Sequence, residues 1–251
     1  MTEKQIKEVY NQIREAKYCI AFTGAGISTL SGIPDFRSGN YEIWKKYDQT
    51  KIFEITYFYK NPKYFYEFAK EAIIPMLEAK PSIIHNLLSL LEEKKYLKCI
   101  ITQNIDLLHQ QSGSKKVYEL HGSPMTSTCL ECEKKYKIEE LKEKIIKESV
   151  PHCDKCGGLI KPDVIFYGEQ LNIETLNKAI EEANKADLCL VLGSTLVVYP
   201  AAIIPEIVIK KKGKIIIVNR DKTHLDDYAL YKFTDLEKFG KELFDEINNI
   251  D

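Results

Sequence analysis

The chain has 251 residues, of which 44% are hydrophobic and 29% are charged, and its net charge at pH 7 is −1. This composition is typical of a globular protein, and so small a charge provides no field that would draw the chain to nucleic acid or to an anionic membrane. No apolar run approaches the ~20 residues of a membrane-spanning helix, so we expect a cytoplasmic protein without membrane contact.

Residues 1–17 predict an amphipathic helix. They lack the apolar middle region of a signal peptide, and Thr2 with Gln5 would form a capping box at the start of the helix. The apolar residues that would share one face are Ile6, Val9, Tyr10 and Ile13.

Four short apolar runs, at residues 18–23, 98–102, 188–192 and 214–218, predict central strands of a sheet. Helix-like segments separate them, and a shorter strand is expected at 117–120. This alternation favours an α/β fold with a Rossmann-like parallel sheet and right-handed crossovers. Ligands of such sheets bind beyond the carboxyl ends of the strands, so the residues that follow each run are the candidates for a site.

A glycine-containing loop, TGAGIST at residues 23–29, follows the first run. Gly24 and Gly26 match the first two glycines of the dinucleotide pattern G-x-G-x-x-G, but Thr29 stands at the third position. No acidic residue closes a second apolar strand about 20 residues later. The loop therefore disfavours an ordinary NAD dehydrogenase.

The next motif, SGIPDFRS at residues 31–38, contains a shape-determining Gly and Pro. Asp35, Phe36 and Arg37 then offer an anion, an aromatic face and a cation. They suit a loop that closes over a flat charged ligand, and the alternative is a surface turn with Phe36 packed inward.

The motif TQNID, residues 102–106, follows a predicted strand. Gln103, Asn104 and Asp106 can hydrogen-bond an amide-bearing ligand such as nicotinamide. Asn and Asp at such a place also commonly cap the next helix, so the motif by itself leaves both interpretations open.

His121 lies in ELHGS, at the point where the sheet gives way to a cysteine-containing segment. A lone histidine is more often structural, but clefts form at such junctions, and an imidazole with a pKa near neutral can act as a general base there. The later motif KPDVIFYGE, residues 161–169, would either receive an extended peptide by strand addition or be a plain strand of a sheet.

Four of the seven cysteines form two C-x-x-C pairs, and this spacing predicts a closed tetrahedral zinc site with a structural role. The alternative is four free thiols. The predicted ligands are Cys129, Cys132, Cys153 and Cys156. The other three cysteines, Cys19, Cys99 and Cys189, lie in apolar runs and are expected in the core.

Two segments interrupt the α/β alternation: the aromatic-rich residues 35–80 and the cysteine-containing residues 124–159. We predict that they form one small domain, a helical insertion and a zinc ribbon, beside a large domain that contains the Rossmann-like sheet. The large domain would comprise residues 1–34, 81–123 and 160–251.

The ordered motifs together resemble the sirtuins, the NAD-dependent protein deacylases. The matching segments are GAGIS (24–28), SGIPDFR (31–37), TQNID with LH (102–106, 108–109), ELHG (119–122), the four cysteines, KPDVIFYGE (161–169), GSTLVVYP (193–200) and VN (218–219). Within the family, AKPSIIHNLL (79–88) and EKKY (93–96) are similar to the bacterial and archaeal deacetylases. One departure is GSTL at 193–196 for the commoner GTSL or GSSL, and it keeps both hydroxyl groups.

The resemblance implies an NAD-dependent protein lysine deacetylase that transfers the acetyl group to ADP-ribose and releases nicotinamide. It implies that His121 is the general base, that Ile105 and Asp106 line a nicotinamide pocket, and that NAD is consumed while zinc is structural. The implied NAD contacts are Ala25, Thr29, Phe36, Arg37, Gln103, Asn104, Ile105, Asp106, His121, Ser194, Thr195, Asn219, Asp235 and Leu236. The implied contacts of the acetylated peptide are Val164, Phe166 and Val197.

Two other functions use the same features. A mono-ADP-ribosyltransferase would share the NAD pocket, and a zinc-ribbon nucleic-acid binder would use the cysteine segment without catalysis. The residues that flank the cysteines mix both charges, so we expect no direct nucleic-acid binding. We expect a monomer that acts on acetylated proteins or peptides.

Overall fold

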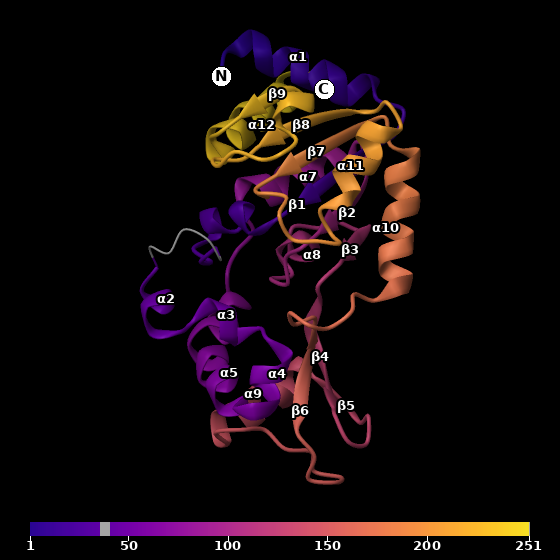
Figure 1. The fold of residues 1–251 in the computed structure, drawn as a ribbon. Helices are drawn as coiled ribbons and strands as arrows, with labels where there is room; N and C mark the ends of the chain where they lie inside the picture. Colours follow the sequence, from indigo (N-terminus) through magenta and orange to yellow (C-terminus); the bar gives the residue numbers. More distant parts are fainter. Residues whose placement is uncertain (36–40, 251) are drawn as a thin grey trace.

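A six-stranded parallel sheet forms the centre of the computed structural model, which describes residues 1–35 and 41–250 (Figure 1). Its strand order is β3-β2-β1-β7-β8-β9. The strands are β1 (Cys19–Thr23), β2 (Leu97–Thr102), β3 (Val117–Glu119), β7 (Leu188–Leu192), β8 (Lys214–Val218) and β9 (Ala229–Phe233). The predicted Rossmann-like sheet is therefore confirmed, and the predicted strands agree with it to within one residue at each end.

Helices cover both faces of this sheet. The first face packs against α1 (Glu3–Glu15), α7 (Ile83–Glu93) and α12 (Leu236–Ile250), and the second against α10 (Ile173–Lys185) and α11 (Ile203–Lys210). The predicted amphipathic helix is α1: its four apolar residues are buried, and Thr2 and Gln5 form the capping box. Because α1 contacts α12, the two ends of the chain lie at the same end of the molecule (Figure 1).

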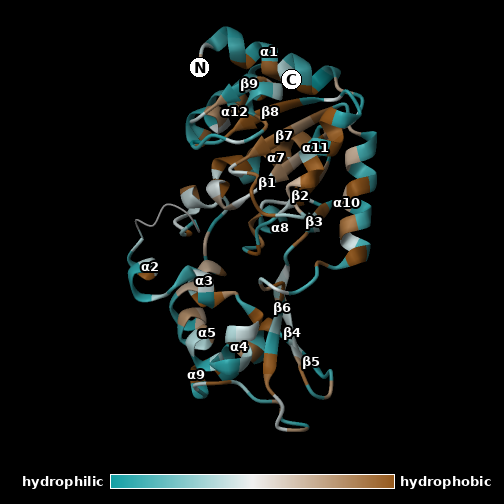
Figure 2. Ribbon diagram, in the orientation of Figure 1, coloured by the Kyte–Doolittle hydropathy of each residue, from teal (hydrophilic) through white to brown (hydrophobic). Residues whose placement is uncertain are grey.

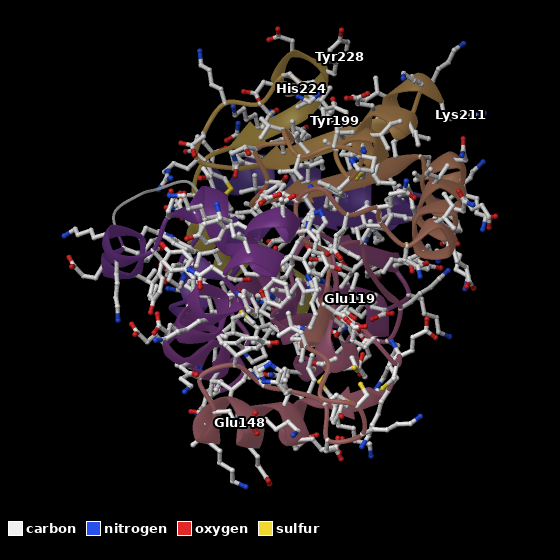
Figure 3. The ribbon with its side chains drawn as sticks, turned by 60° about the horizontal axis from the view of Figure 1, so that its bottom comes forward. Glu119, Glu148, Tyr199, Lys211, His224 and Tyr228 are labelled. Atoms are coloured by element: carbon white, nitrogen blue, oxygen red, sulfur yellow. The ribbon has the colours of Figure 1, made fainter. Side chains whose placement is uncertain are left out.

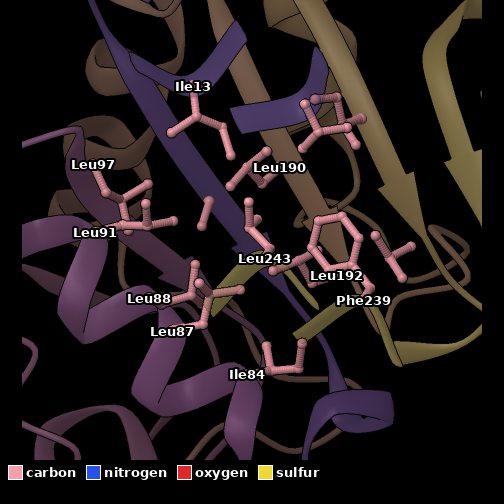
Figure 4. Packing of buried hydrophobic residues seen from close by; sticks show 14 of the residues in the cluster. Ile13, Ile84, Leu87, Leu88, Leu91, Leu97, Leu190, Leu192, Phe239 and Leu243 are labelled. Carbon is pink, nitrogen blue, oxygen red and sulfur yellow. The ribbon is translucent and has the colours of Figure 1, made fainter. Parts of the chain in front are cut away.

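The first face carries a dense aliphatic core. Leu87, Leu88 and Leu91 of α7 project toward β7, where Phe239 and Leu243 of α12 join them (Figure 4). Each is fully buried, and a buried leucine contributes about 1.5–3 kcal/mol to folding. Cys19, Cys99 and Cys189 are also fully buried in the sheet, as predicted.

A smaller module lies beyond the carboxyl edge of the parallel sheet (Figure 1). It contains an antiparallel sheet of order β5-β4-β6 and α9 (Ile138–Lys147). The three strands are β4 (Gly122–Cys129), β5 (Lys135–Lys137) and β6 (Ile160–Val164).

Short helices from residues 42–76 pack on this antiparallel sheet through an aromatic cluster that includes Phe58, Phe65 and Phe166. They are α2 (Glu42–Lys46), α3 (Gln49–Ile52), α4 (Ile55–Lys60), α5 (Pro62–Phe68), a π-helical turn (Ala69–Ile73) and α6 (Ile74–Met76). The fold thus brings the two segments that interrupt the α/β alternation into one hydrophobic core.

Apolar residues concentrate in the strands of the parallel sheet, whereas the outer faces of α1 and α10 are hydrophilic (Figure 2). Within the described part of the chain, no helix has both the length and the apolar character needed to cross a membrane.

Glu182 of α10 is a buried charge that connects this helix to the residues just before β1 and β3. The Glu182 carboxylate accepts hydrogen bonds from the Tyr18 hydroxyl at 2.6 Å, from Lys116 Nζ at 2.8 Å and from Lys185 Nζ at 3.1 Å. Burial by itself would raise the pKa of Glu182, but these donors outweigh burial and lower the pKa to about 2.

We predict that Glu182→Gln lowers the free energy of unfolding at pH 7 by about 1–3 kcal/mol, because both lysines keep partly exposed side chains. A carboxylate with a depressed pKa stabilises the fold above its unfolded pKa of about 4.3, and this contribution is lost as the pH falls toward 2. Urea unfolding at pH 7 and pH 3 should therefore show a smaller difference between variant and wild type at pH 3. The control is Glu174→Gln, which removes an exposed pair with Lys178 on the same helix. An equal loss in both variants, or a loss independent of pH, would contradict this role.

Candidate active site

A cavity of about 970 Å³ lies between the carboxyl edge of the parallel sheet and the smaller module. The loops after β1, β2, β7 and β8 line it on one side, and the segment after β6 lines it on the other. The sequence-predicted residues that line it are Ala25, Thr29, Gln103, Asn104, Ile105, Asp106, His121, Val164, Phe166, Ser194, Thr195, Asn219, Asp235 and Leu236.

Three of the predicted residues are not in this set, and a fourth has a second role. Phe36 and Arg37 lie outside the described residues. Val197 is half-exposed and does not line the cavity, although its neighbours Val198 and Tyr199 do. Asp235 lines the cavity but also caps α12, because its Oδ1 accepts a hydrogen bond from the Lys238 amide at 2.9 Å.

The glycines of the first loop are required by the contact of two loops. A Cβ on Gly26 would lie 2.7 Å from the Cα of Gly193, and a Cβ on Gly24 would lie 2.8 Å from the Gly193 carbonyl oxygen. The Gly26 amide donates to that same carbonyl at 2.9 Å. After β1 the chain forms two 3-10 turns, Ala25–Ile27 and Thr29–Ser31, where a dinucleotide-binding fold usually begins a long helix.

Ser28 connects this loop to the TQNID motif. Its hydroxyl donates to Asp106 Oδ2 at 2.6 Å and accepts from Asn104 Nδ2 at 3.1 Å. Asn104 Nδ2 also contacts the Gly24 carbonyl at 3.2 Å. All three side chains are buried, so the two loops form one rigid floor of the cavity. Sequence reasoning did not identify Ser28 as a site residue, although the GAGIS motif contains it.

The structure supports the helix-terminus interpretation of Asp106, and its contact with a ligand stays a prediction. Its Oδ1 accepts the Leu108 amide at 3.0 Å, at the start of α8 (Leu108–Gln111), so the carboxylate does support a helix terminus. It also lines the cavity and is almost fully buried. Burial raises the pKa of Asp106, while the bonds from Ser28 and Leu108 oppose the rise.

Gln103 presents an unused donor. Its side-chain Nε2 is buried and has no hydrogen-bond partner among the described residues. Leaving such a donor unpaired costs about 1–3 kcal/mol. A ligand in the cavity that carries an acceptor oxygen, such as a ribose hydroxyl or an amide, would satisfy it.

His121 has a defined tautomer. Its Nδ1 lies 2.8 Å from the Gln103 carbonyl oxygen, which can only accept, so Nδ1 carries the proton. Nε2 is then an unprotonated base on a side chain that lines the cavity. Burial lowers the pKa of His121, and the bond to Gln103 opposes this only in part. The imidazole is therefore neutral and able to accept a proton near pH 7.

The four predicted metal ligands meet at the tip of the smaller module. The Sγ atoms of Cys129, Cys132, Cys153 and Cys156 all lie within 4.8 Å of one another. Two of the separations are 3.5 Å and 3.7 Å, too long for disulfides and close to the about 3.8 Å expected between sulfurs of a tetrahedral zinc site. A Cβ on Gly158 would lie 3.0 Å from Cys129 Sγ, so glycine leaves room for the sulfurs. The cluster fits a structural zinc ion with no open position for water.

Figure 3 labels Tyr199, which lines the cavity, together with residues of the smaller module and of the sheet. Glu119, two residues before His121, lies where the sheet meets the smaller module, and Glu148 lies at the outer end of that module. Tyr199, whose side chain is 58% exposed, marks the opposite rim, with His224 nearby. Its hydroxyl contacts Glu206, which His224 Nε2 approaches to 3.1 Å.

Comparison with known proteins gives a consistent result. The sequence model of the Sir2 family matches residues 24–200. An NAD-dependent protein deacetylase of Thermotoga maritima is 48% identical over 243 residues, which cover 96% of this chain and 98% of that protein. An NAD-dependent protein deacylase of Archaeoglobus fulgidus is 44% identical over 89% of this chain and 88% of its own.

Two solved structures are similar over almost the whole chain. A complex of Sir2 with p53 peptide and NAD+ has a TM-score of 0.90 and 46% identity, and the match covers 97% of this chain and 99% of that one. A Sir2 variant with deacetylated p53 peptide and 3'-O-acetyl ADP ribose has a TM-score of 0.91 and 47% identity over 96% of this chain and 98% of that one.

We predict that zinc supports the structure of this protein and takes no part in its chemistry. Cys153→Ala should lose the metal and lower Tm by at least about 10 °C, because losing several kcal/mol shifts Tm by about 2–4 °C per kcal/mol in a chain of this size. Elemental analysis and thermal unfolding check both effects. Cys189→Ala, in the parallel sheet, should keep its zinc. A zinc-free Cys153→Ala protein with wild-type Tm and activity would contradict the assignment.

Proposed function

The chain belongs to the Sir2 family and is an NAD-dependent protein deacetylase, and we propose that the residues lining its cavity carry out the acetyl transfer with His121 as the general base. The reaction gives nicotinamide, O-acetyl-ADP-ribose and deacetylated protein. The observation that carries the proposal is the hydrogen bond that fixes the tautomer of His121. Nδ1 donates to the backbone carbonyl of Gln103, so Nε2 is unprotonated.

NAD would bind along the carboxyl edge of the parallel sheet. Its polar contacts would come from the loops after β1, β7 and β8, through Thr29, Ser194, Thr195 and Asn219, all of which line the cavity. Ala25 would contribute through its backbone. Asp235 and Leu236 would lie at the adenine end, and Phe36 and Arg37, which lie outside the described residues, stay predicted contacts of NAD.

The nicotinamide ring would enter the part of the cavity lined by Ile105 and Asp106. The Nδ2 group of Asn104 is engaged with Gly24 and Ser28, so Asn104 would hold the floor in place. Gln103 Nε2, which has no partner among the described residues, would bind the ribose or the amide. Nicotinamide leaves as the acetyl oxygen forms a bond to the ribose carbon. A rigid floor favours this step, because it fixes the reacting atoms without further ordering.

His121 would then take a proton from a ribose hydroxyl through Nε2, and the oxygen of that hydroxyl would bond to the acetyl carbon. The C–N bond to lysine then breaks, a proton leaves with the amine, and one water supplies the second oxygen, so that the acetyl group ends on the sugar as an ester. The imidazolium that forms is stabilised by its Nδ1–H bond to the Gln103 carbonyl, which strengthens as charge develops. General-base catalysis of this kind contributes about 10²–10⁴ in rate.

The acetylated peptide would lie between the sheet and the smaller module, against Val164 and Phe166, with Val197 at the exposed rim. In the similar Sir2 complexes a p53 peptide is bound. We propose that the chain acts as a cytoplasmic monomer on acetylated proteins, without contact to nucleic acid or membrane. Residues 35–80 and 124–159 would serve as the small domain and residues 1–34, 81–123 and 160–251 as the large one.

His121→Ala should lower kcat/KM for an acetyl-lysine peptide by about 10²–10⁴ while Tm changes little, because the side chain borders a cavity. In the wild type the acidic limb of the pH profile should lie below about pH 6.5, the ordinary histidine pKa, since burial lowers the pKa of His121. Both are measured by release of deacetylated peptide. Near-normal turnover by a folded variant would show that His121 is not the general base. ADP-ribosylated protein as the main product of the wild type would show that the protein is an ADP-ribosyltransferase instead of a deacetylase.

A further inference from the structure

Lys161 is a buried cation in β6 whose side chain is only 8% exposed. Its Nζ lies 2.9 Å from Glu169 Oε2, 2.8 Å from the Val164 carbonyl and 3.2 Å from the Pro162 carbonyl. An ammonium group has three donors, so all of them are used. Nζ also lies 4.2 Å from the ring centroid of Phe166, which adds a cation–π contact.

Glu169 completes a closed loop of interactions. The same Oε2 that meets Lys161 accepts the Phe166 amide at 2.7 Å, and the Glu169 amide donates to the Phe166 carbonyl at 3.0 Å. Burial lowers the pKa of Lys161, and the Glu169 carboxylate opposes this. A buried lysine of this kind is retained in the charged form only with such a partner.

The Lys161–Glu169 pair encloses residues 164–169, which line the cavity on the side of the smaller module. The Phe166 ring of this segment also packs against Phe58 and Phe65, and hydrogen bonds between backbone groups anchor it further. The Ile165 amide donates to the His121 carbonyl at 2.8 Å, and the Tyr167 carbonyl accepts the Ile55 amide at 3.0 Å. The segment thus joins the helices of the module to the residue that carries the base.

Most backbone groups of residues 165–167 are already engaged in hydrogen bonds. Lys161 occupies the Val164 carbonyl and Glu169 occupies the Phe166 amide. The Ile165 carbonyl accepts no hydrogen bond from the described residues. An extended peptide binds a sheet edge through such free backbone groups. The Lys161–Glu169 pair therefore determines which backbone groups of this segment are available to a peptide.

We propose that Lys161 and Glu169 are positioning residues that hold residues 164–169 in the conformation that binds the acetylated peptide. They do not touch the reacting atoms. The proposal rests on the proposed function, because it takes the peptide to lie against Val164 and Phe166. It predicts that the ion pair controls peptide affinity and leaves NAD affinity unchanged, since the NAD contacts lie on the loops of the parallel sheet.

The test compares Lys161→Met with wild type. Binding of a fluorescein-labelled acetyl-lysine peptide is measured by fluorescence anisotropy, and binding of NAD by calorimetry. The peptide Kd should rise by about 10- to 100-fold, because small displacements of a binding segment have effects of this size. The NAD Kd should stay within about twofold, and Lys161→Arg should recover most of the peptide affinity, because guanidinium can also bind a carboxylate.

The matched control is Lys135→Met. Lys135 Nζ lies 3.3 Å from Oδ2 of Asp163, which lies in β6 together with Lys161. The side chain of Lys135 is 66% exposed. This variant should bind the peptide as wild type does. If Lys161→Met does not fold, Glu169→Gln decides by the same two affinities, since it keeps the side-chain volume and removes the charge.

The remaining outcomes count against the proposal. An unchanged peptide Kd in a folded variant would overturn it, and an equal loss of peptide and NAD affinity would reduce the pair to a general structural role. Wild-type protein that binds no acetylated peptide would overturn both this proposal and the function on which it rests. If wild type and variant bind the acetylated peptide with the same Kd, only the positioning role is overturned.

Discussion

The active site depends on the way the chain passes from the parallel sheet to the antiparallel one. β3 ends at Glu119 and β4 begins at Gly122, so His121 lies in the connection between the two sheets. Gly122 has a φ of +74°, and a Cβ there would lie 2.1 Å from the Asp163 carbonyl oxygen. Only glycine allows this approach of β4 to β6, and the approach places the base at the mouth of the cavity.

Two hydrogen bonds then hold His121, one through its side chain and one through its backbone. Gln103, on the loop after β2, accepts the Nδ1 proton of His121, while the Ile165 amide donates to the His121 carbonyl. The large sheet therefore sets the tautomer and the smaller module sets the position. The cysteine cluster lies at the other end of the same two strands, where Cys129 of β4 pairs with Ile160 at the start of β6.

Local patterns were sufficient to predict much of this. Continuous apolar runs predicted β1, β2, β7 and β8, and the C-x-x-C spacing predicted four sulfurs that the fold indeed brings together. β9 was not predicted, because its residues ALYKF contain no continuous apolar run and most of them are partly exposed at the sheet edge. Ser28 and Asp106 are 78 positions apart, and no sequence pattern shows that they touch. For the same reason the sequence did not show that Lys161 is buried. Its burial depends on the contacts that it makes with Glu169 and Phe166 in the folded chain.

The central claim is that this cavity transfers the acetyl group to ADP-ribose. The most direct measurement is mass spectrometry of all products after the purified protein has been incubated with NAD and an acetyl-lysine peptide. The account predicts equal amounts of nicotinamide, deacetylated peptide and O-acetyl-ADP-ribose. Deacetylated peptide formed without NAD, or with free acetate as the first acetyl product, would contradict it.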